Sequence, residues 1–161
     1  MINKLHLAMI ELYSNDAKRI QHFCKVHSYA KLIAETENVD KKCLFIIEAA
    51  ALTHDIGIHF CEEKYGNCNG KLQEKEGPAI AEKMLKELGF DQDVSERVQY
   101  LIAHHHTYNK IDEIDYQILV EADFLVNIME DGLSKEAALK AYHNIFKTSC
   151  GKMICREMFH I

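Results

Sequence analysis

The chain has a single proline among its 161 residues, and it contains few alternating patterns of β-branched residues. Because proline interrupts helices and strict alternation marks half-buried strands, both scarcities favour an all-helical protein. The sequence also lacks an internal repeat and a low-complexity linker, so we expect one domain over residues 1–161. Helices are predicted over seven ranges: 2–13, 16–37, 40–55, 78–88, 92–106, 113–131 and 134–148.

Long apolar runs are missing as well. None approaches the roughly 20 residues that span a bilayer, and the first 16 residues lack the apolar core and cleavage site of a signal peptide. The cysteines form no CxxC pair and no dense framework; they are Cys24, Cys43, Cys61, Cys68, Cys150 and Cys155. Cys61 and Cys68 could form a metal or redox pair, although reduced thiols are the simpler interpretation. We therefore expect a cytoplasmic protein without a membrane partner.

Runs of basic residues are also absent. The net charge is −6, and the 19 lysines and arginines are scattered along the chain. This distribution gives no electrostatic reason to expect a nucleic acid polymer as a partner. A small anionic substrate would need a local cation or a metal ion.

One segment carries no sustained hydrophobic period. Residues 57–77 (GIHFCEEKYGNCNGKLQEKEG) hold four of the seven glycines. A structureless connection of this length is unusual in a compact domain and often forms a lid or binding loop, although a plain surface excursion is an equal alternative. Because it follows His54 and Asp55 directly, we expect it to lie near the functional site.

Three polar residues stand on apolar helix faces. His22 lies at helical spacing from Val26, Tyr29 and Ile33. His54 lies at helical spacing from Cys43, Ile47, Ala50 and Ala51. Asp123 lies at helical spacing from Leu119, Val120 and Val126. A lone histidine on such a face is usually a hydrogen-bonded core residue. A buried aspartate is harder to explain, because its charge must be paired or neutralised, and no lysine or arginine is obviously adjacent. A divalent cation would satisfy all three.

Asp55 follows His54 immediately, and neighbours in a helix do not share a face. Both could reach one ion only near a helix end, and Gly57 favours an end at that point. His54 and Asp55 are therefore the centre of the predicted site.

The pattern as a whole resembles the HD superfamily of metal-dependent phosphohydrolases. The matching stretches are RIQHFCKVHSYAKLIA (19–34), AALTHDIG (50–57), GPAIAEKML (77–85), LIAHHHTY (101–108) and LVEADFLVN (119–127). They cover residues 16–130, with a short helix before them and a helical tail (134–161) after them. The resemblance implies a compact all-α bundle of six to seven helices, with a metal held by His22, His54, Asp55 and Asp123.

Some HD proteins bind a second metal through two further histidines. The run His104–His106 supplies one of them, and His105 is favoured because it shares a stripe with Val94, Val98 and Leu101. Where the other would stand the chain has no histidine, only Gln73, Glu74 and Glu76. A carboxylate such as Glu76 could substitute, and His104 and His106 could be exposed or contact substrate or water. We favour one metal, with two as the alternative.

The resemblance implies hydrolysis of a small phosphate ester or nucleotide by a metal-activated water. Asp55 is the candidate for orienting or deprotonating that water, and Arg19 and Lys110 are candidates for binding phosphate. The ligand set suits Mn, Fe, Co, Ni, Zn or Mg without choosing among them.

Two other functions remain open on the sequence. One is a metal- or nucleotide-binding sensor module without catalysis, and the other is a two-iron oxygenase of the kind found among HD relatives. The intact ligand set counts against the first, and the missing histidine near residue 73 counts against the second. A homo-oligomer is compatible with every one of these functions.

Overall fold

The structure, a computed structural model, describes the whole chain from Met1 to Ile161 and contains helices but no strands. Nine helices follow one another: α1 (Ile2–Leu12), α2 (Ala17–Thr36), α3 (Lys41–Thr53), α4 (Ile58–Tyr65), α5 (Gly70–Glu87), α6 (Gln92–Ile102), α7 (Ile114–Glu130), α8 (Lys135–Asn144) and α9 (Ser149–Phe159). The predicted all-α class is confirmed, and the number of helices is higher than the expected six to seven.

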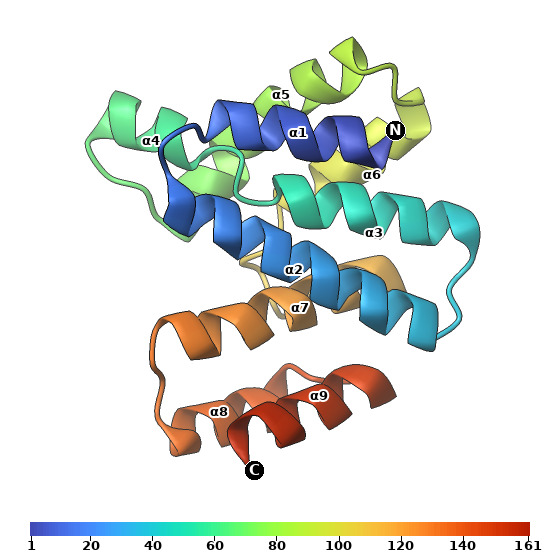
Figure 1. Ribbon diagram of the computed structural model, residues 1–161, viewed down its shortest axis with the longest axis vertical. Coiled ribbons are helices and arrows are strands. Elements are labelled where there is room, and N and C mark those ends of the chain that lie inside the picture. The colour runs from blue at the N-terminus through green and yellow to red at the C-terminus, as the bar shows by residue number, and fades with distance from the viewer.

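Helix α3 occupies the centre of the fold. It packs against α1, α2, α6 and α7, and its residues from Ile46 to Thr53 are buried without interruption (Figure 1). Apart from Glu48, which pairs with His27 and Lys31, this run is uncharged on every side, and such a helix is stable only in the interior. The apolar run before His54 therefore becomes the helix around which the others pack.

Helices α2 and α7 lie side by side across the middle of the molecule (Figure 1). Beyond α7, α8 and α9 pair with each other at the C-terminal end, and α9 contacts both α7 and α2. The buried carboxylate of Glu121, on α7, holds the start of α9: its Oε1 accepts from the backbone N–H of Thr148 (2.9 Å). The predicted tail of residues 134–161 is thus a helical pair that packs on α7.

Several helix ends carry residues that favour a helix end. Asp16 caps α2 by accepting from the backbone N–H of Arg19, and Ser134 caps α8 in the same way. Gly89 follows the end of α5 with φ +79°, a conformation that costs glycine little.

The expectation of a structureless connection over residues 57–77 is wrong. Helix α4 takes up Ile58–Tyr65, and α5 begins at Gly70, so only residues 66–69 connect the two helices. Pro78 lies inside α5, whereas the sequence placed it in the first turn. The cap signal that marks the true start is Asn69, whose side chain accepts from the backbone N–H of Leu72 (3.0 Å).

The glycines of this segment serve mainly close packing. A Cβ at Gly57 would lie 3.1 Å from the backbone nitrogen of Gly77, and a Cβ at Gly77 would lie 2.8 Å from Ile102. Gly57 lets α5 approach the turn that follows α3, and Gly77 lets α5 approach α6. Their concentration therefore reflects tight helix contacts near His54 and Asp55.

One stretch, Lys41–Tyr65, is long and apolar enough to meet a simple test for a membrane span, with a mean hydropathy of 1.4 in its best window. This window is 61% buried inside the protein, and the stretch consists of α3, a turn and α4. Its apolar residues are accounted for by the core.

Candidate metal centre

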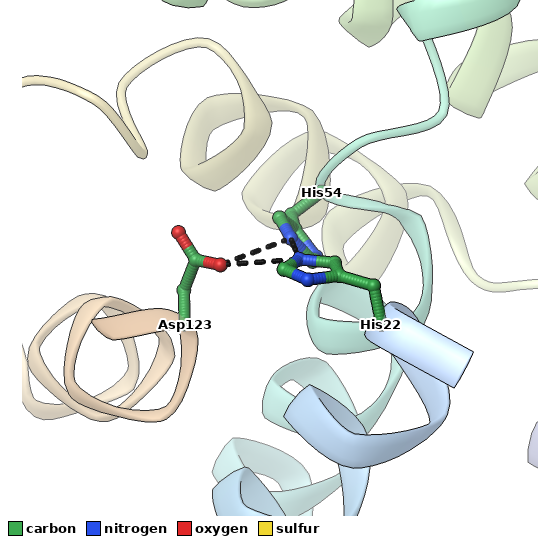
Figure 2. A group of neighbouring side chains, drawn as sticks. All are labelled: His22, His54 and Asp123. Atoms are coloured by element: carbon green, nitrogen blue, oxygen red, sulfur yellow. Dashed lines mark hydrogen bonds and ion pairs between the residues drawn. The ribbon is translucent and has the colours of Figure 1, made fainter. Parts of the chain in front are cut away.

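Four side chains from three parts of the chain meet where α2, α3 and α7 come together. His22 lies in α2, His54 at the C-terminal end of α3, Asp55 in the turn after it, and Asp123 in α7. Helix α3 ends at Thr53 with His54 as its C-cap, and the chain turns over residues 54–57, so Asp55 leaves the helix and its carboxylate lies beside the His54 ring. Figure 2 shows His22 and His54 facing the carboxylate of Asp123.

The donor atoms of these residues are close together. The Nε2 atoms of His22 and His54 lie 3.2 Å apart. Oδ1 of Asp123 is 3.2 Å from Nε2 of His22 and 3.5 Å from Nε2 of His54, and Oδ2 of Asp55 is 3.5 Å from each of these nitrogens. Ligand atoms about 2.1 Å from a common ion are separated by roughly 3.0 to 3.4 Å, so the spacing fits a metal centre.

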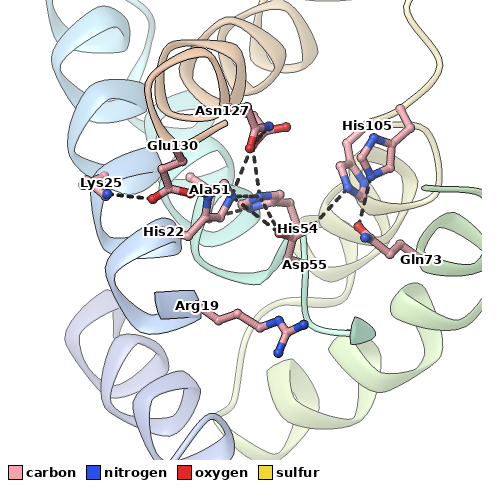
Figure 3. A network of polar contacts seen from close by, with 12 residues as sticks. Arg19, His22, Lys25, Ala51, His54, Asp55, Gln73, His105, Asn127 and Glu130 are labelled. Atoms are coloured by element: carbon pink, nitrogen blue, oxygen red, sulfur yellow. Dashed lines mark hydrogen bonds and ion pairs between the residues drawn. The ribbon is translucent and has the colours of Figure 1, made fainter. Parts of the chain in front are cut away.

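The outer nitrogen of each ring is already occupied. Nδ1–H of His54 donates to the carbonyl oxygen of Ala51 (2.9 Å), and Nδ1–H of His22 donates to Oε2 of Glu130 (2.9 Å), as Figure 3 shows. A carbonyl or carboxylate oxygen can only accept, so Nδ1 must carry the proton. In the neutral rings both Nε2 lone pairs then point at each other and at a carboxylate, an arrangement that a shared cation satisfies.

The charges of the buried side chains also favour a cation at this centre. Burial would lower the pKa of His54, but the carboxylates of Asp55 and Asp123 outweigh it and raise that pKa to about 9. Burial would raise the pKa of Asp55, yet His54 and His105 lower it to about 2. The pKa of Asp123 is also lowered, because the two histidines outweigh its burial. Two ionised carboxylates in a buried site need positive charge nearby, supplied by protonated histidines or by a metal ion.

A second group of donors adjoins the first and shares Asp55. It consists of Asp55, His105 and His106, whose ligand atoms lie within 4.8 Å of one another. Nδ1–H of His105 donates to the carbonyl of Ile102 (2.8 Å), while its buried Nε2 lies 3.5 Å from Oδ1 of Asp55 and has no hydrogen-bond partner. A buried nitrogen without a partner, aimed at a carboxylate, is a further position where a cation fits.

His106 is fixed by the first turn of α5. Its Nε2 lies 3.0 Å from Oε1 of Gln73, its backbone N–H donates to Glu74 (3.0 Å), and its ring lies against Gly70. Burial and the neighbouring His105 lower the pKa of His106 to about 4, so the ring is neutral at physiological pH. The segment that lacks the expected histidine therefore contacts the histidine run through Gln73.

Three predicted residues lie apart from these donors. Glu76 contacts the Tyr65 hydroxyl and Lys64. Nδ1–H of His104 donates to the carbonyl of Tyr100 (2.7 Å), and Lys110 is an exposed loop residue. Of the residues predicted for a second metal site, His105 lies next to Asp55. His106 belongs to the same group of donors.

Arg19 lies one turn before His22 but is held by carboxylates. Its guanidinium donates to Asp16 (2.6 Å) and to Glu62 (2.6 Å), and its side chain is 34% exposed. Figure 3 shows it beside the centre, near the α3–α4 turn. A phosphate would have to compete with these acids for it.

Sequence reasoning missed the residues that support the donors. Asn127 donates from Nδ2 to Oδ1 of Asp123 (2.9 Å), and the buried Tyr13 hydroxyl donates to the backbone carbonyl of Asp55 (2.7 Å). Asn127 and Glu130 follow Asp123 by four and seven residues, so helical spacing was a usable signal for both. No sequence signal links Tyr13 to Asp55, because they are 42 residues apart.

Cys61 is buried and Cys68 is half-buried, and both are free thiols in the structure. Neither belongs to the two groups of metal donors.

Comparison with known proteins agrees with this geometry. The sequence model of the HD domain family, described as "HD domain", matches residues 19–141. A search of curated proteins found no match. Among solved structures, a predicted HD superfamily hydrolase from an uncultured Thermotogales bacterium is similar, with a TM-score of 0.71 and 24% sequence identity over 98% of this chain and 84% of that chain. This likeness supports the fold.

The family match covers most of the chain and includes every donor of both groups, from His22 to Asp123. The chain therefore belongs to the HD domain family, a family of metal-dependent hydrolases.

Proposed function

We propose that this protein is a metal-dependent phosphohydrolase that cleaves a small phosphate ester or nucleotide to an alcohol and inorganic phosphate. The observation that carries the proposal is the set of histidine Nε2 and carboxylate oxygen atoms at 3.2–3.5 Å around His22, His54, Asp55 and Asp123. A divalent ion held there supplies polarisation of a phosphoryl oxygen and acidifies water.

Asp55 has the geometry to position the attacking water. Its two oxygens face different groups: Oδ2 faces His22 and His54, and Oδ1 faces His105. The side chain is 21% exposed, so water can reach it. With a pKa of about 2 the carboxylate is a weak base, which favours accepting a hydrogen bond from water over removing its proton.

Arg19 is the best-placed cation for the phosphate. It lies one turn from His22 and is partly exposed, and it could exchange a contact with Glu62 for a more highly charged phosphoryl group. Lys110 is an exposed loop residue, so its assignment rests on the sequence alone.

Four histidines and two aspartates in two adjoining groups leave room for one ion or two. We favour one ion held by His22, His54, Asp55 and Asp123. The second group offers a ligand set of Asp55, His105 and His106, with Gln73 in contact with the last.

The test is phosphate release from a panel of nucleoside monophosphates, sugar phosphates and p-nitrophenyl phosphate with Mn²⁺, Co²⁺, Ni²⁺, Zn²⁺ or Mg²⁺. We expect activity with at least one metal and a loss of about 100-fold or more in Asp123→Ala. Glu87→Gln, at an exposed residue far along α5, is the control and should leave activity unchanged.

Metal binding without phosphate release from any of these substrates would favour a sensor module. Metal-independent activity, or activity that survives in Asp123→Ala, would contradict the proposed centre.

A further inference from the structure

His22 differs from His54 and His105, the two other histidines that donate through Nδ1–H at the centre, in what holds its ring. The Nδ1–H groups of His54 and His105 donate to backbone carbonyls, which no substitution can remove. That of His22 donates to a side chain, Oε2 of Glu130, at 2.9 Å. The ring of His22 is therefore held by a side chain that a substitution can remove.

Glu130 stands in an unfavourable place for a carboxylate. It is the last residue of α7, where the unpaired carbonyls give a helix end partial negative charge. Lys25 compensates: its Nζ lies 2.6 Å from Oε1 of Glu130. Lys25 follows His22 by one turn on α2, so α2 presents both partners of Glu130 on one face, as Figure 3 shows.

The two oxygens of Glu130 thus have separate partners. Lys25 binds Oε1, and Oε2 is left to accept from His22. A carboxylate oxygen can only accept here, so Oε2 keeps the proton on Nδ1 of His22 and leaves the Nε2 lone pair free for a metal ion.

We propose that Glu130, anchored by Lys25, is a positioning residue that fixes His22 as an Nε2 donor and sets the affinity of the centre for divalent metal. The inference rests on the proposed metal site. It assigns a role to a side chain that does not itself touch the ion.

The test compares Glu130→Leu, which removes the acceptor, with Glu130→Gln, whose amide oxygen can still accept from Nδ1–H. Glu87→Leu is the matched control, because Glu87 is likewise the last residue of its helix but is exposed. Zn²⁺ affinity is measured by competition with a chromophoric chelator. We expect affinity to fall about 10- to 100-fold in Glu130→Leu, by a smaller factor in Glu130→Gln, and not at all in Glu87→Leu.

A second readout separates positioning from general stability. In the Zn²⁺-loaded protein, nitrogen-15 NMR of the histidine side chains should show a slowly exchanging Nδ1–H for His22 in the wild type and in Glu130→Gln. That signal should be lost in Glu130→Leu. The melting temperature of the metal-free Glu130→Leu protein should match that of Glu87→Leu.

The outcomes are distinguishable. If the wild type binds no metal, both the metal site and this inference are wrong. If the wild type binds metal and Glu130→Leu binds it within twofold, only the inference is wrong. Equal losses in Glu130→Leu and Glu130→Gln would also overturn it, because charge alone would then be responsible. So would a marked fall in the metal-free melting temperature of Glu130→Leu, which would assign Glu130 to the stability of α7.

Discussion

At the scale of single residues, the metal centre must balance the negative charge of its two aspartates. Asp55 and Asp123 are ionised, and Arg19 and Lys25, which flank the centre in Figure 3, are each already bound to other acids. The imidazoles are left to compensate for the two aspartates unless a metal does so. The protonation of His54 therefore links the stability of the metal-free protein to pH.

In the metal-free protein we expect stability to fall as pH rises from about 6.5 to 8.5. The pKa of His54 is raised in the folded state from 6.5 to about 9, so its stabilising contribution is complete below the unfolded value and is lost as pH approaches the folded value. The pKa of Asp55 is lowered to about 2, so its contribution is constant over this window. Melting temperature, measured in chelator at several pH values, should fall by a few degrees.

The control is His143→Gln, a substitution on the outer helix α8, whose melting temperature should fall with pH as in the wild type. In His54→Gln the melting temperature should depend much less on pH. A melting temperature that is flat or rises with pH in the wild type would show that His54 is not protonated against the two carboxylates.

The sequence was informative at this scale wherever a polar residue interrupted an apolar stripe. That rule selected His22, His54 and Asp123, which the structure brings together. The same rule did not select Asn127 and Glu130, because polar residues on a helix usually face water. Only the packing of the neighbouring helix shows that these two residues face the centre. It also undervalued His106, since nothing local shows that Gln73 and Glu74 hold it in place.

At the scale of helices and turns, the largest error concerned residues 57–77. Glycines were taken as signs of a flexible connection, whereas Gly57, Gly70 and Gly77 each allow another group to approach closely. Sequence alone does not separate these two uses of glycine, because the difference lies in a neighbour that is distant along the chain. The same segment remains next to the centre, as its position after Asp55 indicated.

We expect Gly70→Ala to disturb the second donor group. A Cβ at this position would lie 2.7 and 2.8 Å from two ring atoms of His106, and the ring cannot move freely because Gln73 and Glu74 hold it. The free energy of unfolding should fall by about 1–3 kcal/mol, as for other overpacked sites. Denaturant unfolding measures this, and Lys71→Ala, at the exposed next residue, should change it by less than about 0.5 kcal/mol.

If Gly70→Ala is as stable as Lys71→Ala, then His106 moves away at little cost. The contact between the start of α5 and the histidine run would in that case be loose.

The junction of α7 with α9 depends on Glu121. Its Oε1 accepts from the backbone N–H groups of Lys147 (2.6 Å) and Thr148 (2.9 Å), and Oε2 accepts from the hydroxyl of Thr148 (2.5 Å). In Glu121→Gln the amide NH₂ cannot accept, so either these backbone groups or the hydroxyl lose their acceptor. We expect a loss of about 1–3 kcal/mol in the free energy of unfolding.

Hydrogen exchange should locate the effect of Glu121→Gln. Amides of α8 and α9 should exchange faster, while those of α3 should keep their relative protection. Uniformly faster exchange throughout the chain would mean that the C-terminal pair does not open separately from the core.

At the scale of the whole molecule, the all-α class was predictable because it depends on composition and on helical periodicity. The number of helices was not, since α4 is short and α8 and α9 are divided only by the turn that Glu121 caps. The fold brings together α2, the end of α3 and α7, which carry His22, His54 and Asp123 from positions about 30 to 70 residues apart in sequence. Family resemblance supplied the set of four ligands, and the fold shows how the chain places them.

A metal at this centre would join three helices that surround the core, so its binding should stabilise the entire domain. A ligand present at 100 times its dissociation constant stabilises the folded state by about 2.7 kcal/mol if the unfolded chain does not bind it. For a domain of this size that corresponds to a rise in melting temperature of roughly 5 to 10 °C. We expect this rise on addition of Mn²⁺ or Zn²⁺ to chelator-treated protein at pH about 7.5, measured by calorimetry.

The matched variants decide where that stabilisation arises. Asp123→Ala removes a donor and should abolish the rise, whereas Glu121→Gln, two residues away on α7, should have a lower starting melting temperature but the same rise. If both variants lose it, the ion acts through the packing of α7 as a whole. If Asp123→Ala retains it, the ion binds elsewhere, since the site has then lost the carboxylate that faces both His22 and His54.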